Sequence, residues 1–580
     1  MRNDIPPCCR NYSPAFVEGI SGKSLKKDNV AKHSKSQMHE EARRREKRPT
    51  ASISNLYTST PISRVMAVAS SEEEERVQKL FDVAYYLAKE ELPFAKFPSL
   101  LALEKRQRVA LGNTYATDKK CREFKDVISQ TLKDAVLKDM KASPYISLLM
   151  DGSTDCSVKG KEPIHMMFAR QDGTIDCRFL RLKDVADATA EGIFATVQDV
   201  FAEMGIDDWK TKLIGLCVDG AAVNLGRRRG LVTLLRQEVP WIEGIHCLNH
   251  RLELAAKDAF SETYMTEVTK VLMDMYYVYQ KSPQRLRQLR DLGIILETAP
   301  LAKLSCNLQG SLMDLPLAIA ILDTLHVSAE RLREGTIETT EITKFLSAVD
   351  VDNGRADYCG VKLTGVRRDV LEAFNNSRNL YITAVNNCVA NRMNDLKKDF
   401  FKAVRLLDTK LWPTDKDQIM GYGDSEISSA VRHFNLALEA KNTSVENIMS
   451  EWTTFKVFWL DNLQHVEKNK ICPIVLTEYS HSFSNLVHFI RILLLLPVSN
   501  AIVERGFSAM RRIKTDWRSS LGKESLDNLM RISIDGPPTE NFEPKEATRW
   551  FFTTARRSGT QPYGSRKRKY GDSNSESVSL

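Results

Sequence analysis

The sequence predicts a mixed α/β fold built around short buried strands. Two apolar runs, residues 146–150 and 213–218, each end abruptly in an Asp-Gly pair, which is how a buried strand delivers a carboxylate to the edge of a sheet. A third segment, residues 496–513, places apolar residues at helical spacing and an acidic residue, Glu504, near the helix start. Two strands and a distant helix that together offer three carboxylates indicate one core with a long insertion.

The composition is that of a soluble globular protein. The 580 residues are 42% hydrophobic and 27% charged, and the net charge of +8 permits a polyanionic partner without requiring one. The 11 cysteines are scattered, so we expect free thiols in a reducing compartment. The N-terminus lacks an apolar signal segment, and the apolar run 492–496 is too short to span a bilayer. We expect an intracellular protein with neither a membrane partner nor a small-molecule substrate.

Residues 1–48 form a polar, basic leader. His33 and His39 have the spacing of the second half of a zinc finger, but Cys8 and Cys9 are adjacent and cannot chelate one ion as a pair. Two interpretations stay open: a degenerate finger that holds Zn²⁺ in part through the two histidines, and a disordered leader. The basic run 43–48 suits nuclear import or nucleic-acid binding, with a solvated charge run as the alternative.

Two segments separate this leader from the predicted strands. Residues 49–70 are rich in Ser, Thr and Pro and are typical of a linker. Residues 71–142 have helical periodicity, and their acidic start follows two serines, as in a capped helix. We expect a helical region whose role the sequence does not reveal.

The next segment, residues 143–260, predicts the first part of an RNase-H-like core. Three strands are followed by a helix, a fourth strand and two further helices. Three strands, a helix and a fourth strand are the order in which that fold begins. The predicted strands are residues 145–150, 164–169, 177–182 and 213–218, and the predicted helices are residues 189–204, 223–239 and 245–260.

The remaining chain is predicted to be helical and then disordered. Residues 261–475 show only helical periodicity, so we expect an all-helical insertion. Residues 476–535 return to the core, where Pro497 can open a helix and Ser499 or Asn500 can cap it. Residues 536–580 are polar, contain the basic cluster 566–569 and are expected to form a disordered tail.

The candidate catalytic site is an acidic set: Asp151, Asp219 and Glu504. Two divalent metals about 4 Å apart need bridging and flanking carboxylates to activate water and to stabilise the leaving oxygen of a phosphodiester. Hard oxygen ligands select Mg²⁺ or Mn²⁺. Taken singly, each Asp-Gly is more often a turn, and Glu504 is an ordinary first-turn residue favoured by the helix dipole.

Basic and apolar residues near the acidic set have two interpretations each. The cations suit a phosphate backbone or are ordinary solvated groups. The apolar residues form a dimer surface or pack within the chain. Cys247 and His250 offer half of a tetrahedral zinc site or belong to a helix core, while His250 and Arg251 can also approach a scissile phosphate. The cations are Arg227, Arg228, Arg229, Arg511, Arg512 and Lys514, and the apolar residues are Phe507, Met510, Trp517, Leu521, Leu526 and Leu529.

Four motifs in order resemble those of hAT transposases and of the host genes derived from them. The resemblance covers residues 140–260 and 475–535. It implies an RNase-H-like core with an all-helical insertion, a C-terminal dimerisation region and a DDE-type site at Asp151, Asp219 and Glu504, with His250 at the site and Cys247, Arg251 and Arg505 in support. The motifs are Met-Asp-Gly-Ser-Thr-Asp at 150–155, Val-Asp-Gly-Ala-Ala-Val-Asn-Leu-Gly at 218–226, His-Cys-Leu-Asn-His-Arg-Leu-Glu-Leu at 246–254 and Ser-Asn-Ala-Ile-Val-Glu-Arg-Gly-Phe-Ser at 499–508.

Three departures from the family pattern shape the functional expectation. The finger is incomplete, the segment 292–312 is shortened, and no tryptophan lies between Trp241 and Trp412, where family members carry one that handles the DNA end. We therefore expect a domesticated, nuclear homodimer that associates with DNA or chromatin and retains an inactive DDE-type site. One alternative is an active cut-and-paste transposase that cleaves and transfers strands with Mg²⁺. The other is a protein-interaction scaffold or regulatory adaptor without DNA binding.

Overall fold

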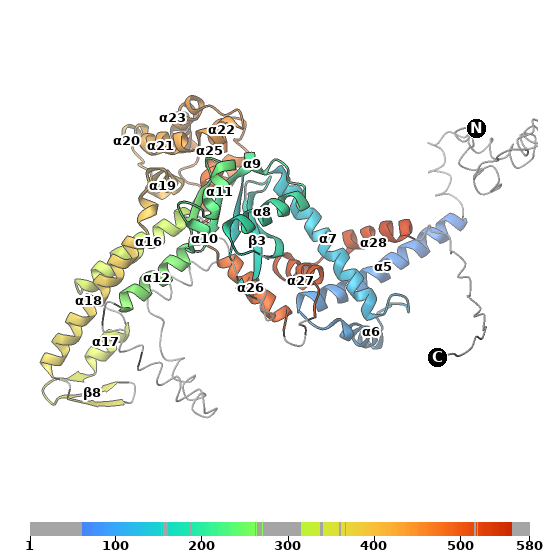
Figure 1. Cartoon of the computed structure of the whole chain (residues 1–580), viewed down its shortest axis with the longest axis horizontal. Coiled ribbons are helices and arrows are strands. Elements are labelled where there is room, and N and C mark those ends of the chain that lie inside the picture. Colours follow the sequence, from blue (N-terminus) through green and yellow to red (C-terminus); the bar gives the residue numbers. More distant parts are fainter. Residues whose placement is uncertain are drawn as a thin grey trace, which may run out of the picture. The chain divides into compact units, whose positions relative to one another are not determined.

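The computed structural model divides the chain into two compact units (Figure 1). The first consists of Met1–Val83, Phe97–Thr117 and Glu543–Leu580, and the second of Ala84–Lys96 and Asp118–Phe542. The predictions for the leader, with His33 and His39, and for Trp517 lie outside the described residues. The structure describes residues 61–558 except 152, 155–159, 186, 262, 264–269, 271–314, 337–339, 359–360, 366, 516–517 and 519.

The first unit is helical in its described part. Helix α5 (Pro61–Lys89), whose residues up to Val83 belong to this unit, begins inside the predicted linker, because a proline suits the first helical position. It is joined by α6 (Phe97–Arg106) and α28 (Lys545–Ser558). The ring of Phe551 packs edge-on against Phe81 and Tyr115, with ring centroids 5.9 and 5.6 Å away. The predicted disordered tail is therefore wrong for α28, whose aromatic residues contribute to packing.

The second unit is organised on one mixed sheet. Its order is β4-β3-β1-β5-β6, with the short β2 also beside β3. Strands β4, β3 and β1 are antiparallel neighbours, whereas β1, β5 and β6 are parallel. The mixed α/β class is thereby confirmed. The strands are β1 (Ile146–Met150), β2 (Ser153–Thr154), β3 (Gly160–Ala169), β4 (Ile175–Asp184), β5 (Leu213–Val218) and β6 (Glu243–His246).

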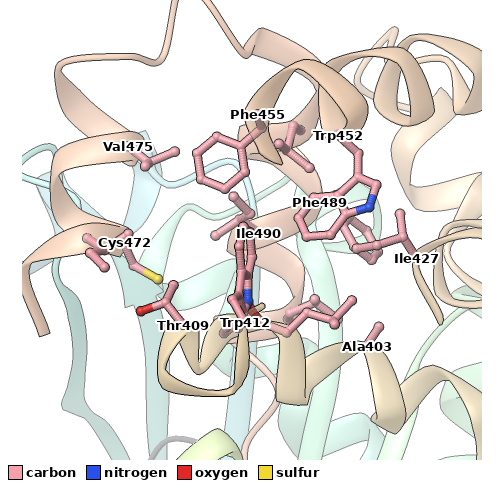
Figure 2. A pocket seen from close by; sticks show the side chains of 15 residues that line it. Ala403, Thr409, Trp412, Ile427, Trp452, Phe455, Cys472, Val475, Phe489 and Ile490 are labelled. Carbon is pink, nitrogen blue, oxygen red and sulfur yellow. The ribbon is translucent and has the colours of Figure 1, made fainter. Parts of the chain in front are cut away.

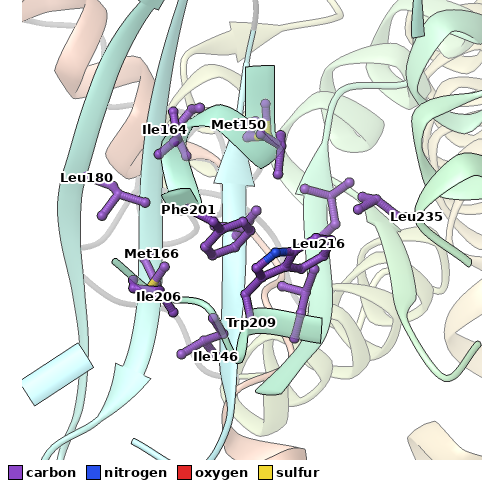
Figure 3. Packing of buried hydrophobic residues seen from close by; sticks show 14 of the residues in the cluster. Ile146, Met150, Ile164, Met166, Leu180, Phe201, Ile206, Trp209, Leu216 and Leu235 are labelled. Carbon is purple, nitrogen blue, oxygen red and sulfur yellow. The ribbon is translucent and has the colours of Figure 1, made fainter. Parts of the chain in front are cut away.

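One face of the sheet packs against helices that follow the strands. Alternate residues of β1, such as Ile146 and Met150, join a buried cluster with Phe201 of α8 (Ala190–Met204) (Figure 3). Phe201 stacks on Trp209 with ring centroids 4.9 Å apart. Thr189, the first residue of the predicted helix, caps α8, and Gly205 ends it at a φ of 60°, a conformation that glycine adopts without strain. Also on this side are α9 (Trp209–Lys212) and α11 (Leu231–Glu238).

The C-terminal helices contact the sheet as well. Helix α26 (Ala501–Ile513) contacts β3, and α27 (Lys523–Asp535) contacts β4 and α7 (Asp118–Ala142). Intramolecular packing, the alternative that the sequence left open, uses most of the apolar residues considered for a dimer surface. Phe507, Met510, Leu526 and Leu529 are buried within the chain, and Leu521 is half-buried.

Charged residues of α27 satisfy the outer edge of β4, the edge strand. Arg531 is 2% exposed and donates to the carbonyls of Phe179 at 2.9 Å and Leu180 at 2.8 Å. Asp527, also 2% exposed, accepts from the Leu182 amide at 2.8 Å. Because an uncovered strand edge is a template for aggregation, α27 protects the sheet while it orders the C-terminal region.

The insertion is mostly helical but contains a small sheet that the sequence did not predict. Strands β7 (Val349–Asp350), β8 (Arg355–Tyr358) and β9 (Val361–Thr364) pair as an antiparallel meander. The prediction of an all-helical insertion is therefore wrong for these strands, because short extended segments are hard to distinguish from turns between helices. The described helices are α12 (Leu248–Ser261), α16 (Leu315–Arg333), α17 (Thr340–Ser347), α18 (Arg368–Arg392), α19 (Asp399–Val404), α20 (Lys416–Met420), α21 (Asp424–His433), α22 (Asn435–Glu439), α23 (Val445–Asn462), α24 (Lys468–Thr477) and α25 (Ser484–Leu494).

Helices α19 to α25 enclose an aromatic core with a small cavity. Trp412, Phe455 and Phe489 line it with aliphatic neighbours (Figure 2). Its volume is about 30 Å³, whereas small-molecule sites measure roughly 300–1,000 Å³. The cavity is therefore a packing feature. Among the described helices, none is both long and apolar enough to cross a membrane.

Replacing Arg531 with methionine is expected to destabilise the core. The change leaves two strand carbonyls without their guanidinium donor and removes one of the two arginines from the buried Asp527 carboxylate, which keeps Arg181 at 3.1 Å. Leaving a buried polar group without its partner costs about 1–3 kcal/mol. Urea unfolding followed by circular dichroism measures the loss. The exposed Arg511→Met is the control and is expected to change the free energy of unfolding by less than about 0.5 kcal/mol. Equal effects of the two variants would contradict the edge-covering role of Arg531.

Candidate functional site at the strand ends

Asp151 and Asp219 lie at the same edge of the sheet. Each directly follows a parallel strand, β1 or β5, and these strands are neighbours. One carboxylate oxygen of Asp219 accepts hydrogen bonds from the Ala221 amide at 3.0 Å and from the Asn224 side chain at 2.7 Å. Asp151 is half-buried. The structure thus places the two predicted aspartates at adjacent strand ends, as the sequence pattern predicts.

Glu162 is an acidic residue of this edge that sequence reasoning missed. It lies on β3 and is 6% exposed. Met150 of β1 pairs with Ile164, so Glu162 extends past the last pair toward the Asp151 end. Burial, and then the charges of Asp151 and Asp219, raise the pKa of Glu162 to about 8. The sequence signal that could have identified Glu162 is a single acidic residue within a strand that is otherwise rich in apolar residues.

Glu504 lies in the first turn of α26, the helix whose N-cap residue contacts the end of β1. Asn500, at the N-cap position, donates from its side-chain nitrogen to the Met150 carbonyl at 2.8 Å. The Glu504 amide donates to the Asn500 carbonyl at 3.0 Å, and the Glu504 side chain is exposed. Within the described ranges, no three His, Cys, Asp or Glu side chains are grouped so that they could hold a metal ion. Asp151, Asp219 and Glu504 therefore stay a predicted ligand set.

Cys247 has a supporting position between strands and helices. Its amide donates to the Val218 carbonyl at 2.9 Å, and its sulfur accepts from the Asn500 amide at 3.2 Å. A hydrogen bond from the Cys217 thiol, acting against burial, lowers the pKa of Cys247 to about 7. Cys247 is 1% exposed. Through these contacts it connects the end of β5 and the start of α12 to the start of α26.

The two histidines beside Cys247 differ in environment. His246 packs against the turn after Asp219, since a Cβ at Gly220 would lie 2.5 Å from the imidazole Cε1. Burial, and then the charge of Arg251, lower the pKa of His246 to about 4. His250 is half-buried, with its ring centroid 5.5 Å from that of His246. A phosphate contact from His250 stays a prediction.

Arg251 connects the core to the insertion. It is 4% exposed and donates to the Arg392 carbonyl at 3.2 Å, next to the end of α18. Arg392 in turn donates to Asp258 of α12 at 2.7 and 2.9 Å. Arg251 therefore has a structural contact that the sequence did not predict, and Arg505, which follows Glu504, is exposed.

The arginine triplet lies on a turn, so the predicted helix over 223–239 is wrong at its centre. Helix α10 (Ala222–Leu225) ends and α11 begins only at Leu231. The Gly230 amide donates to the Gly226 carbonyl at 2.9 Å, and a Cβ at Gly230 would lie 2.4 Å from the Gly226 nitrogen. This close approach requires glycine, and Arg227, Arg228 and Arg229 on the same turn are all exposed.

The predicted cations at the end of α26 are less accessible to a phosphate backbone than those of the arginine turn. Arg511 is exposed, but Arg512 makes a two-pronged contact with Glu91, with both N–O distances 2.9 Å. Lys514 is 8% exposed. The arginine turn is therefore the clearest exposed basic segment that follows a strand-end aspartate in the chain.

The predicted helix over 245–260 also needs correction, because its first residues form strand β6, which pairs with β5.

Two comparisons with known families match this arrangement. Residues 103–228 match a family described as "ZMYM1/FAM200, RNase-like domain", a range that contains Asp151, Glu162 and Asp219. Residues 449–533 match the "hAT family C-terminal dimerisation region", which contains Glu504 and begins inside the predicted insertion. The first match agrees with the observed sheet order, so the prediction of an RNase-H-like core is confirmed.

A Glu162→Gln variant is expected to change how stability depends on pH. The unfolded carboxyl loses its proton near pH 4.5, whereas the folded one keeps it until about pH 8. The folded state binds more protons in this window, so Glu162 lowers stability as the pH rises through it. Glutamine, which stays neutral, removes this loss.

Thermal unfolding of both proteins between pH 5 and pH 9, recorded by circular dichroism, measures the difference. The melting temperature of the variant should exceed that of the wild type increasingly toward pH 9. Glu253→Gln, at an exposed position of α12, is the control and should follow the wild type. Parallel curves for Glu162→Gln and wild type would contradict the raised pKa.

Proposed function

Because the chain is a hAT-derived protein with a C-terminal dimerisation region, we propose that it acts as a nuclear homodimer that associates with DNA or chromatin. In this proposal the DDE-type site is retained but does not catalyse cut-and-paste transposition. The observation that supports it most is the exposed arginine turn directly after the strand-end acids. Basic runs at 43–48 and 566–569 support nuclear import.

The arginine turn suits a phosphate backbone. Arg227, Arg228 and Arg229 are consecutive and exposed, and the glycine-closed turn holds their backbone in place. Three cations on a short rigid segment can neutralise neighbouring phosphates without reading bases. This contact would not depend on the base sequence of the DNA, which suits association with chromatin.

The acidic edge has the chemistry of a hard divalent-metal site. Asp151, Asp219 and Glu504 offer carboxylate oxygens, which suit Mg²⁺ or Mn²⁺. Burial raises the pKa of Glu162 most, and the charges of Asp151 and Asp219 raise it further; a cation would offset the part that comes from these charges. A bound metal would activate water at a phosphodiester. The hydrogen bonds from Ala221 and Asn224 would hold the Asp219 carboxylate in one orientation.

We propose that transposition is lost because this chain lacks parts that handle the DNA end in the family it resembles. No tryptophan lies between Trp241 and Trp412, and segment 292–312 is shortened. Glu504 is exposed at the first turn of α26, so the acidic set would need a rearrangement to bind metal together. These features favour a binding role over strand transfer.

Replacing the three turn arginines with glutamine is expected to weaken DNA binding and its salt dependence. Three lost phosphate contacts should lower the slope of log affinity against log salt by about 2.7. Fluorescence anisotropy on duplex DNA at several salt concentrations measures it, and sedimentation should find two protein chains per complex. The control variant replaces Lys119, Arg122 and Lys138, exposed residues of α7, with glutamine. Absence of wild-type DNA binding would favour the adaptor alternative.

Metal binding is expected to require both strand-end aspartates. Mn²⁺ titrated into the full chain should bind, and an Asp151→Asn, Asp219→Asn double variant should lose at least about 10-fold in affinity. An Asp134→Asn, Asp199→Asn variant, at exposed positions, is the matched control. We expect no nicking of supercoiled DNA by any of these proteins. Nicking by wild type that the double variant lacks would support an active transposase, and equal Mn²⁺ affinities would mean that the acids are structural.

A further inference from the structure

Cys217 and Cys247 form a buried pair of thiols on one face of the sheet. Cys217 lies on β5 and is paired with Ile245 of the neighbouring strand β6. The ladder continues one residue past β6, because the Cys247 amide donates to the Val218 carbonyl at 2.9 Å. Side chains alternate between the faces of a sheet, so Cys247, two residues after Ile245, shares a face with Cys217. Neither is in a disulfide, and they are 0% and 1% exposed.

Cys247 also stands at the start of a helix. Its carbonyl accepts the first hydrogen bond of α12, from the Arg251 amide at 3.0 Å, which places Cys247 at the N-cap. Its sulfur accepts hydrogen bonds from the Asn249 and His250 amides, as a capping side chain does. The Asn500 amide, which lies just before α26, donates to the same sulfur at 3.2 Å. Three backbone amides therefore converge on one sulfur.

The Cys217 thiol is a fourth donor to this sulfur. Its hydrogen bond is the largest of the effects that lower the pKa of Cys247 to about 7, while burial acts in the opposite direction. The pKa of Cys217 shifts the other way, because burial and then the bond to Cys247 hold it well above its usual range. At neutral pH one sulfur of the pair is therefore partly thiolate, and its neighbour is a protonated thiol.

Burial alone would produce two neutral, unreactive thiols. A cysteine in a core behaves as a small apolar residue, and apolar surroundings raise its pKa. Cys121 follows this pattern, since it is 0% exposed and burial raises its pKa to about 12. Cys247 departs from the pattern because of the donors around its sulfur. A thiolate next to a second thiol is the arrangement of an oxidisable cysteine and its resolving partner.

We propose that Cys217 and Cys247 are an oxidation site that closes to a disulfide in the presence of hydrogen peroxide. The Cys247 thiolate attacks one peroxide oxygen, the O–O bond breaks and hydroxide leaves, which yields a sulfenic acid. The sulfur of Cys217 then attacks the sulfur of Cys247. The S–S bond forms, the S–O bond breaks, and the Cys217 proton leaves with the hydroxyl group as water. Peroxide gains the two electrons that the two sulfurs lose.

Burial determines which oxidant can act on this pair. Hydrogen peroxide is close to water in size, whereas exchange with a disulfide reagent requires access of a bulky molecule to the thiolate. Peroxide is therefore the oxidant that suits this site. The disulfide would replace a charged acceptor with a neutral one, which weakens the hydrogen bonds from the Asn249, His250 and Asn500 amides. Oxidation would thus loosen the contact between the start of α12 and the start of α26.

The test treats the folded full chain with hydrogen peroxide, alkylates the remaining thiols after unfolding, and identifies tryptic peptides by mass spectrometry. Cys217 and Cys247 fall in different peptides, residues 213–227 and 237–251, each with one cysteine. We expect these two peptides to be linked with the loss of two hydrogens, and dithiothreitol to release them. In a Cys217→Ser variant the link should disappear, and dimedone should trap the sulfenic acid on Cys247.

Cys388 is the matched control, because it is also buried and lies alone in the tryptic peptide 379–392. It should stay alkylatable at a peroxide dose that links the pair, and Cys388→Ser should leave the link unchanged. Circular dichroism checks that each variant is folded, and Cys217→Ala replaces Cys217→Ser if the latter unfolds. Oxidation of the pair no faster than that of Cys388, or oxygen added to Cys247 of the wild type without a link to Cys217, would overturn the proposal.

Discussion

The hydrogen bond from Asn500 to the Met150 carbonyl joins the two parts of the core that the insertion separates in the sequence. It joins residues 350 positions apart in the sequence, so closing it requires the whole insertion to leave and re-enter the core at the correct places. Contacts of Leu248 with Val498 and of Cys247 with Asn500 lie beside it. The two ends of the insertion are therefore held beside each other at the core.

Residues of the C-terminal region pack against the sheet of their own chain, in addition to any part they have in dimerisation. Arg531 and Asp527 of α27 satisfy backbone groups of β4, and the apolar side of α26 packs on β3. A family region described by dimerisation is thus also the cover of an edge strand. Self-association through this region must use surfaces other than its buried apolar residues.

Negative charge at the strand ends is balanced within the sheet only in part. Burial, and then the charges of Asp151 and Asp219, raise the pKa of Glu162, while one oxygen of Asp219 accepts two hydrogen bonds. The arginine turn follows Asp219 in the chain and adds cations at the solvent side. A polyanion and a divalent cation would each relieve a different part of this charge pattern.

The sequence by itself determined β1, β3, β4 and β5, the order of the motifs and the placement of Asp151 and Asp219, because apolar runs, two of which end in Asp-Gly, are local signals. Tertiary structure alone decided that Glu162 shares their edge, that the Arg227 turn interrupts a helix, and that Asn500 bonds to Met150. These features depend on strand register and on contacts between segments far apart in the chain, which no local pattern encodes.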